Sequence, residues 1–186
     1  MEITNNVSTL WEKSNYLNKD IPYIISKEIT EYDIRSAGFN IIKRYGLVDS
    51  KRLQLLHNTS REHRHVLIGL WCKDDKELSA ALGEGFKDIR KSFFIANEIV
   101  DSDILSIKKD AIITTKHCDV CEFDNIEFVP KNRYTSYFYL NKIEFYVGRY
   151  ELDVKGINDE KLKLHRQYML DFLFRVFKML SNNVNF

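Results

Sequence analysis

Residues 24–46, IISKEITEYDIRSAGFNIIKRYG, contain the transition that decides the fold. Up to Ile34 the stretch is rich in β-branched residues and predicts a strand. From Ser36 onward apolar residues recur at helical spacing, and Gly46 is a typical residue to end a helix. The stretch therefore predicts a strand that leads directly into a helix, with Asp33 close to the junction.

The chain beyond Gly46 divides into a helical part and a β-rich part. After a short element over residues 49–56, Thr59-Ser60-Arg61-Glu62 has capping-box spacing and opens a helix. Asp74 is expected to cap a longer helix from residue 76 to about residue 100. Short β-rich runs then follow at 104–107, 111–115, 126–129, 134–140, 143–147 and 150–154.

The last predicted element is a helix over residues 158–180. Its apolar residues recur close to helical spacing and are expected to pack against the core. They are Leu162, Tyr168, Met169, Phe172, Leu173, Val176, Phe177 and Leu180. Helices segregated from an antiparallel β-meander predict an α+β fold. We expect a single α+β domain over residues 21–186, after a polar N-terminal arm over residues 1–20.

Composition excludes several classes of protein. The chain has 186 residues, 44% hydrophobic and 30% charged, which excludes a disordered tail. Its 28 basic and 27 acidic residues exclude a globally basic nucleic-acid-binding protein. No apolar run is long enough for a membrane span. Three cysteines without a framework, and a start unlike a signal peptide, predict a cytoplasmic protein with free thiols. The many Lys, Ile and Asn residues fit an AT-rich bacterial or phage genome.

Two aspartates are candidates for a metal site. Asp33 ends the first strand, and Lys108-Lys109-Asp110 predicts a tight hairpin with Asp110 near its tip. If the strand end lies beside the hairpin, the two carboxylates can hold one or two Mg²⁺ ions, as in phosphoryl-transfer enzymes. The alternative is that each aspartate only stabilises a turn or cap.

The run Asp33-x-x-Ser36-x-x-Phe39 resembles the first catalytic motif of palm-domain nucleic-acid polymerases. It is closest to the family B pattern D-x-x-S-L-Y-P-S and more loosely similar to the family A pattern D-x-S. Lys109-Asp110-Ala111 stands where these enzymes have D-T-D-S or H-D-E. The resemblance implies a palm-like domain in which Asp33 and Asp110 are catalytic and bind Mg²⁺. It further implies nucleotides and nucleic acid as partners.

The same resemblance implies phosphate contacts from Arg61, Arg64 and Lys109, with a second choice of Lys87, Arg90 and Lys91 on the next helix. The chain departs from the family at several points. Lys109 replaces the first Asp of D-T-D-S, and Gly38-Phe39 replaces Tyr-Pro. The chain also has no room for a thumb or full fingers. We therefore expect a minimal palm that acts with a protein partner, and nucleotidyl transfer if it is catalytic.

Two alternatives belong to other classes. The first is a non-catalytic phage or mobile-element protein that binds a host protein or nucleic acid. The second is a Mg²⁺-dependent nuclease, because Asp153 and Lys155 alternate on one strand as in the D/E-x-K half of PD-(D/E)-x-K enzymes. Asp124 or Asp110 would supply the upstream carboxylate.

Two further patterns have both a functional and a structural interpretation. His117-Cys118-x-x-Cys121 supplies three candidate zinc ligands, with a fourth required from His57, His63 or His65. The aromatic residues of 134–146, among Lys131, Arg133 and Lys142, fit either base stacking on an exposed sheet or cross-strand pairs in a core.

Overall fold

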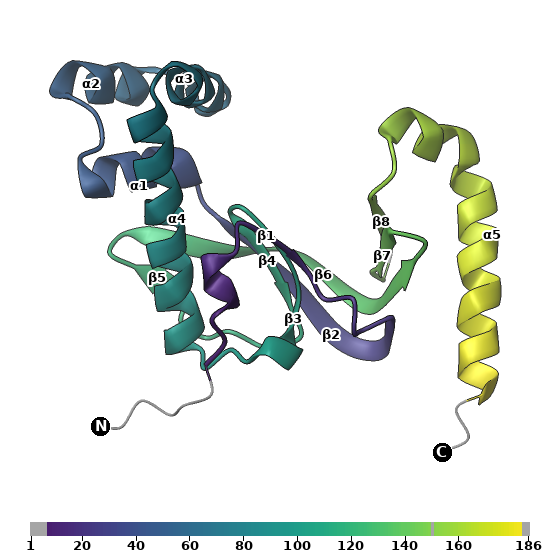
Figure 1. Ribbon diagram of the computed structural model, residues 1–186. Helices are drawn as coiled ribbons and strands as arrows, with labels where there is room; N and C mark the ends of the chain where they lie inside the picture. The colour runs from purple at the N-terminus through teal and green to yellow at the C-terminus, as the bar shows by residue number, and fades with distance from the viewer. Residues whose placement is uncertain (1–6, 150, 184–186) are drawn as a thin grey trace.

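The computed structural model describes residues 7–149 and 151–183 (Figure 1). The helices are η1 (Leu10–Glu12), α1 (Ala37–Tyr45), α2 (Ser50–Asn58), α3 (Arg61–Asp74), α4 (Lys76–Ala96), η2 (Asp101–Asp103) and α5 (Asp159–Asn183). The strands are β1 (Asn15–Leu17), β2 (Tyr23–Ile34), β3 (Ile104–Lys108), β4 (Ala111–Thr114), β5 (Glu122–Phe123), β6 (Ile126–Leu140), β7 (Ile143–Val147) and β8 (Leu152–Lys155). The predicted α+β fold, an antiparallel sheet packed by helices, is confirmed.

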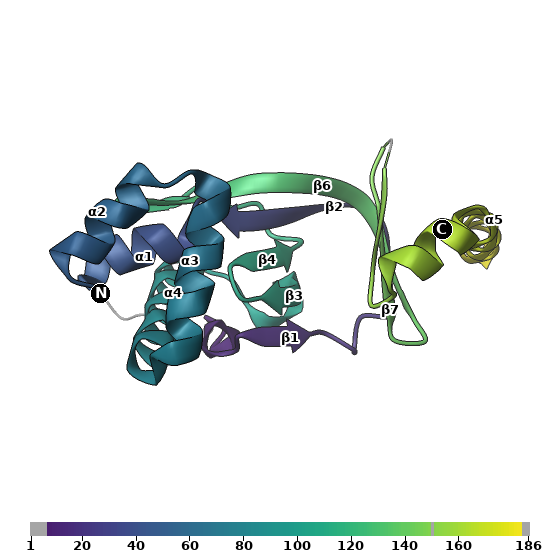
Figure 2. The ribbon, with the colours of Figure 1, turned by 90° about the horizontal axis from the view of Figure 1, so that it is seen from above.

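The strands form one curled sheet in the order β1-β3-β4-β2-β6-β7-β8, with β5 paired to β6. Every pair is antiparallel. Lys108 of β3 and Glu144 of β7 are separated by β4, β2 and β6, yet their Nζ and Oε1 atoms lie 2.9 Å apart. The sheet therefore curls until side chains of non-neighbouring strands meet on its inner face. Figure 2 shows α1–α4 at one end of this sheet and α5 at the other.

The predicted strand-to-helix transition is present. β2 runs to Ile34 and α1 begins at Ala37, with Ser36 in the left-handed conformation between them. Gly46 ends α1 with a φ of 59°, and its N–H donates to the carbonyl of Ile42. This positive φ is the conformation for which glycine is favoured.

Both predicted helix caps are wrong by one residue. Ser60 caps α3, because its Oγ accepts from the N–H of His63. Asp75 caps α4, because its Oδ1 accepts from the N–H of Leu78 at 2.9 Å. Asp74 belongs to the last turn of α3, so Asp75 is the first residue with the extended backbone that a cap requires.

The runs predicted at 126–129 and 134–140 are one strand, β6. Pro130 lies within it, opposite Tyr32, at an irregularity in the pairing between Glu31 and Tyr32. Proline has no N–H to donate and is tolerated in a strand at such a bulge. β6 therefore continues past Pro130 as one long strand of the sheet.

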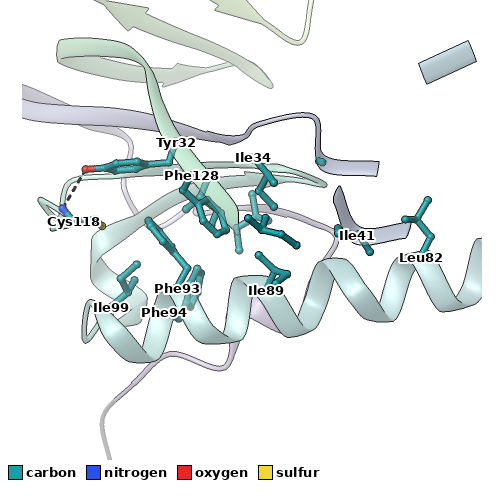
Figure 3. Packing of buried hydrophobic residues seen from close by; sticks show 14 of the residues in the cluster. Tyr32, Ile34, Ile41, Leu82, Ile89, Phe93, Phe94, Ile99, Cys118 and Phe128 are labelled. Carbon is teal, nitrogen blue, oxygen red and sulfur yellow. Dashed lines mark hydrogen bonds between the residues drawn. The ribbon is translucent and has the colours of Figure 1, made fainter. Parts of the chain in front are cut away.

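The main core lies between α1–α4 and one face of the sheet. Figure 3 shows side chains of α4 meeting those of β2 and β6. The rings of Phe93 and Phe128 stack with centroids 4.2 Å apart, and Phe93 also contacts Tyr32. The hydroxyl of Tyr32 accepts from the N–H of Cys118 at 3.1 Å. These contacts fix the helices over the face of β2 that carries Tyr32 and Ile34. Asp33 lies between them in the sequence and therefore on the other face of the strand.

The prediction that the whole apolar stripe of the last helix packs against the core is wrong. Leu173 is buried and Val176 is half-buried against β7 and β8. Tyr168 and Phe172 are 72% and 42% exposed. The side chains of Leu162, Phe177 and Leu180 lie outside the described part of the structure. The small core here covers only a narrow strip of α5.

Part of the predicted N-terminal arm, residues 1–6, lies outside the described residues. The rest contains η1 and β1, and β1 pairs with β3 at the edge of the sheet. In the described part of the chain, no helix combines the length and apolar character needed to cross a membrane.

Candidate functional site

Asp33, near the end of β2, lies beside the hairpin turn that carries Asp110, as the sequence predicted. Asp33 is opposite Ala111 of β4, and Asp110 lies in the turn that joins β3 to β4. The N–H of Ile34 donates to the carbonyl of Asp110 at 3.1 Å. Lys109, in the same turn, has a positive φ of 51°. The strand end and the hairpin tip are thus joined through the backbone.

The charges around Asp33 act on its carboxyl group in opposite directions. Burial, followed by the nearby carboxylate of Asp110, raises the pKa of Asp33, and Lys131 and Arg61 oppose the rise. The Nζ of Lys131 is 3.9 Å from Oδ2 of Asp33. The net effect is a raised pKa, which means that burial and Asp110 together disfavour the ionised form of Asp33. A cation placed between the two carboxylates would relieve this repulsion.

A cavity of about 530 Å³ adjoins the hairpin tip, between α3 and α4. Its charged and titratable lining residues are His65, Cys72, Glu84, Lys87, Arg90, Lys109 and Asp110. Gly69 and Gly83 also line it, and a Cβ atom at either position would meet open space. This volume lies in the range of small-molecule sites.

The predicted basic residues differ in what they do. Lys109 lines the cavity. Arg61 is close enough to Asp33 to oppose the rise in the pKa of Asp33. Arg64 is instead held at the junction of α2 and α3. Its Nε donates to the carbonyl of Thr59 at 2.9 Å, and its guanidinium lies over the ring of Phe39.

Among the second-choice residues, Lys87 lines the cavity and pairs with Glu84. Arg90 is buried and donates to the carbonyls of Trp11 and Lys109 at 3.0 and 2.5 Å. Lys91 lies over the ring of Trp11. Arg90 therefore fixes the hairpin tip against α4.

A second polar cluster lies on the inner face of the sheet, around the buried Glu31. Its Oε1 accepts from Nζ of Lys155 at 3.1 Å, and its Oε2 accepts from Asn132 at 2.8 Å. The hydroxyl of Tyr134 lies between Oε2 of Glu31 and Oδ2 of Asp153, at 3.2 and 3.1 Å. We call these five residues the inner cluster.

The inner cluster bears on the nuclease alternative. Asp153 and Lys155 share a face, as predicted, with Nζ of Lys155 3.6 Å from Oδ2 of Asp153. The carboxylate that joins them is Glu31, whereas Asp124 pairs with Arg44 at 2.6 Å and Asp110 lies at the hairpin tip. Both oxygens of Glu31 are engaged by hydrogen bonds, so the cluster links β2, β6 and β8.

Cys118 and Cys121 lie close together, because the thiol of Cys121 donates to the carbonyl of Cys118 at 3.4 Å. His117 pairs with Asp119 near the surface, while Cys118 is buried and its thiol donates to the carbonyl of Lys116. Burial raises the pKa of Cys118 to about 12. Within residues 7–149 and 151–183, no group of three His, Cys, Asp or Glu residues is placed to hold a metal ion.

The aromatic residues of β6 and β7 pack against one another. Tyr134, Tyr137 and Tyr146 are buried, and the ring of Tyr146 lies 5.2 Å from Tyr134 and 5.0 Å from Tyr137. This matches the interpretation as cross-strand pairs. The three buried rings offer no surface on which bases can stack.

The sequence interpretation gave no role to Glu31, although it lies inside the decisive stretch. The two-residue period of a strand places Glu31 and Asp33 on the same face. This alternation in the sequence could have identified Glu31 as a residue on the face of the candidate site. Lys131 was named only as an exposed basic residue. Its approach to Asp33 depends on the pairing of β6 with β2, which the sequence alone does not specify.

Comparison with known proteins gives one finding. A family model described as Bacteriophage PBS1 gene 130 protein matches residues 3–185. No curated protein and no solved structure matches the chain. The resemblance to polymerase palms therefore has no support from these comparisons and stays a prediction.

Proposed function

The chain belongs to the bacteriophage PBS1 gene 130 protein family, and we propose that it binds a nucleotide together with Mg²⁺ at the hairpin tip. One observation carries the proposal. Asp33 of β2 lies beside the β3–β4 turn that carries Asp110, and Asp110 also lines a cavity with Lys87, Lys109 and His65. The carboxylate of Asp110 in the lining, that of Asp33 on the adjacent strand end and several cationic side chains would complement a metal ion with its phosphates.

The residues present fit Mg²⁺ brought in by phosphate better than Mg²⁺ alone. Asp33 and Asp110 supply two carboxylates, and Mg²⁺ in such sites completes its shell with water and substrate phosphate oxygens. When bound, the ion supplies charge neutralisation at the phosphates. Lys87 and Lys109 then contact the remaining phosphate oxygens, while Arg90 holds the carbonyl of Lys109 and so positions the tip.

Nucleotidyl transfer is the activity that this site would support. Asp33 on its strand and Asp110 on its hairpin would hold the metal that activates the attacking hydroxyl and neutralises the leaving group. The minimal size of the chain favours action with a protein partner. A binding protein without catalysis would use the same cavity and the same two carboxylates.

Thermal unfolding with nucleoside triphosphate, with Mg²⁺ and with both together tests binding. We expect a clear rise in Tm only with both, because a ligand at about 100 times its Kd stabilises by about 2.7 kcal/mol. The gain should disappear in Asp33→Asn and Asp110→Asn. Asp119→Asn, a carboxylate 88% exposed on its side chain, is the matched control and should keep the gain. A wild-type Tm unaffected by the combination would contradict the proposal.

A cavity-filling variant separates the cavity from the carboxylates. Gly83 lies in α4, and its added side chain would enter open space. Gly83→Leu should keep or raise the stability of the unliganded protein, because glycine is a poor helix former. The same variant should lose the nucleotide-dependent rise in Tm. Gly83→Ala serves as the control and should retain it.

Labelled primer–template with nucleotides and Mg²⁺ then tests chemistry. Extension that is lost in Asp33→Asn supports nucleotidyl transfer. Binding without extension supports the non-catalytic alternative. Shortening of the strand, lost in Lys155→Met, supports a nuclease centred on the inner cluster.

A further inference from the structure

Four apolar side chains of α5 are exposed on one side of the helix. They are Leu164, Tyr168, Phe172 and Met179, which are 79%, 72%, 42% and 66% exposed. Their spacings of four, four and seven residues place them on one side of an α-helix. We call them the outer stripe. It lies beside the strip, around Leu173 and Val176, that packs on the sheet.

The position of α5 leaves this stripe open. Figures 1 and 2 show α1–α4 at the opposite end of the sheet, and α5 standing alone beside β7 and β8. The stripe extends over roughly 22 Å of helix, from the rise per residue of an α-helix. An apolar surface of this length on one helix is typical of an interaction site.

The order of residues along the outer stripe is symmetric. Leu164 and Met179 lie equally far from the peptide bond between Asp171 and Phe172, and so do Tyr168 and Arg175. Arg175 falls on the same side of the helix, between Phe172 and Met179. A two-fold axis that passes near this bond and relates two copies of the helix would bring Leu164 of one copy against Met179 of the other. It would also bring the Arg175 guanidinium against the Tyr168 ring.

We propose that the outer stripe binds the outer stripe of a second copy of the chain, with the two α5 helices antiparallel. Leu164 then packs on Met179 of the second copy, Tyr168 on its Arg175, and the two Phe172 rings meet at the axis. An interface of this kind is self-complementary, as two-fold symmetry requires. The pairing of Arg175 with Tyr168 adds a cation–π contact in each half.

Charge distinguishes this arrangement from its competitors. A parallel pair would set Arg175 against Arg175, and the antiparallel pair avoids that repulsion. Insertion into a lipid surface would bring Arg175, within the stripe, and the neighbouring Asp171 towards the acyl chains. Membrane-surface helices instead keep their charges on the opposite face.

The strength of the association follows from its size. A standard interface buries about 800 Å² on each partner, and one helix stripe supplies less. We therefore expect a reversible dimer whose population depends on protein concentration.

Sedimentation of the full-length chain over a range of concentrations tests the proposal. Wild type should shift from monomer to dimer, and Phe172→Glu should weaken the association at least tenfold. Phe174→Glu is the matched control, since Phe174 is 70% exposed on another side of the same helix. Circular dichroism verifies that both variants keep α5. A wild-type chain that stays monomeric at all concentrations overturns the proposal, and so does binding to anionic vesicles by such a monomer. Equal weakening by Phe174→Glu and Phe172→Glu also overturns it.

Cysteine crosslinking tests the orientation. A mixture of Leu164→Cys and Met179→Cys chains should form a disulfide between unlike chains, and each variant alone should crosslink much less. Wild type sets the background from Cys72, Cys118 and Cys121. Crosslinking of each variant with itself, without the mixed product, would show a parallel pair and overturn the antiparallel arrangement.

Discussion

At one end of the sheet, α1–α4 pack against Tyr32, Ile34 and Phe128. At the other end, α5 alone lies beside β7 and β8 (Figure 2). Among the side chains that the structure describes, 18 are buried in the core beneath α1–α4 and four in the core beneath α5. Helices that pack on one another as well as on a sheet bury several sides, whereas a single helix on a sheet edge buries one strip. The described core is therefore larger at the first end, and the second end leaves apolar side chains of α5 exposed.

The inner cluster lies between these ends and joins them. Glu31 belongs to the strand beneath the helices, while Lys155 belongs to the last strand before α5. Nζ of Lys155 also lies over the ring of Tyr146, whose hydroxyl donates to Glu144 at 2.6 Å. Substitutions at the helical end, in the inner cluster and at the α5 end should therefore differ in how much unfolding free energy they remove. They should also differ in how many helices and strands they destabilise.

The largest effect is expected from Phe93→Ala in the helical end. Phe93 is fully buried and contacts Tyr32 and Phe128, so the substitution leaves a large cavity. We expect a loss of about 3–5 kcal/mol in the free energy of unfolding, measured by urea denaturation. All probes of unfolding should shift together. A loss below about 1 kcal/mol would show that this end is not the stable core.

A loss of about 1.5–3 kcal/mol is expected from Lys155→Met, because it removes a charged hydrogen bond to the buried carboxylate of Glu31. Burial raises the pKa of Glu31, but Lys155 and the hydrogen bond from Asn132 outweigh it and hold the pKa below its ordinary value. A lowered carboxyl pKa stabilises the fold above the unfolded pKa, near 4.3, and this contribution is lost as the pH falls.

Urea denaturation at neutral pH and near pH 4 measures both effects. Wild type should lose stability as the pH falls towards 4, and Lys155→Met should lose less. Lys142→Met, an exposed lysine in the β6–β7 turn, is the control and should behave as wild type. Identical pH profiles for Lys155→Met and wild type would contradict the assigned role of Lys155.

A smaller and more local effect is expected from Leu173→Ala at the α5 end. Leu173 is buried among few neighbours, so the loss should be about 2 kcal/mol, at the low end for leucine. Hydrogen exchange should increase in α5, β7 and β8 and stay unchanged in α4. Equal exchange at both ends would show that they unfold as one unit.

The smallest effect on stability is expected from Phe174→Ala. Phe174 is 70% exposed, and substitutions at such positions change the free energy of unfolding by less than about 0.5 kcal/mol. Thermal unfolding of dilute protein provides the measurement. A larger loss would place Phe174 in a contact that stabilises the single chain, and would weaken the contrast between the ends.

Local sequence signals predicted much of the fold. The β-branched run before Ile34, the helical spacing after Ser36 and the stop at Gly46 each depend on neighbouring residues only. The same holds for the hairpin at Asp110 and for the last helix. The caps at Ser60 and Asp75 were missed by one residue, because adjacent side chains of similar capping ability compete and packing of the whole helix decides between them.

The sequence by itself indicated the strand-to-helix transition at Ile34, the hairpin at Asp110 and most of the helices in their order, because these follow from spacing along the chain. The tertiary structure alone decided that Glu31 meets Lys155, that Arg90 holds the hairpin tip, and that most of α5 stays uncovered. Each of these depends on how far the sheet curls and on strand register between distant segments. Apolar spacing shows that a helix has a face to bury, whereas only the fold determines how much surface is present to cover it.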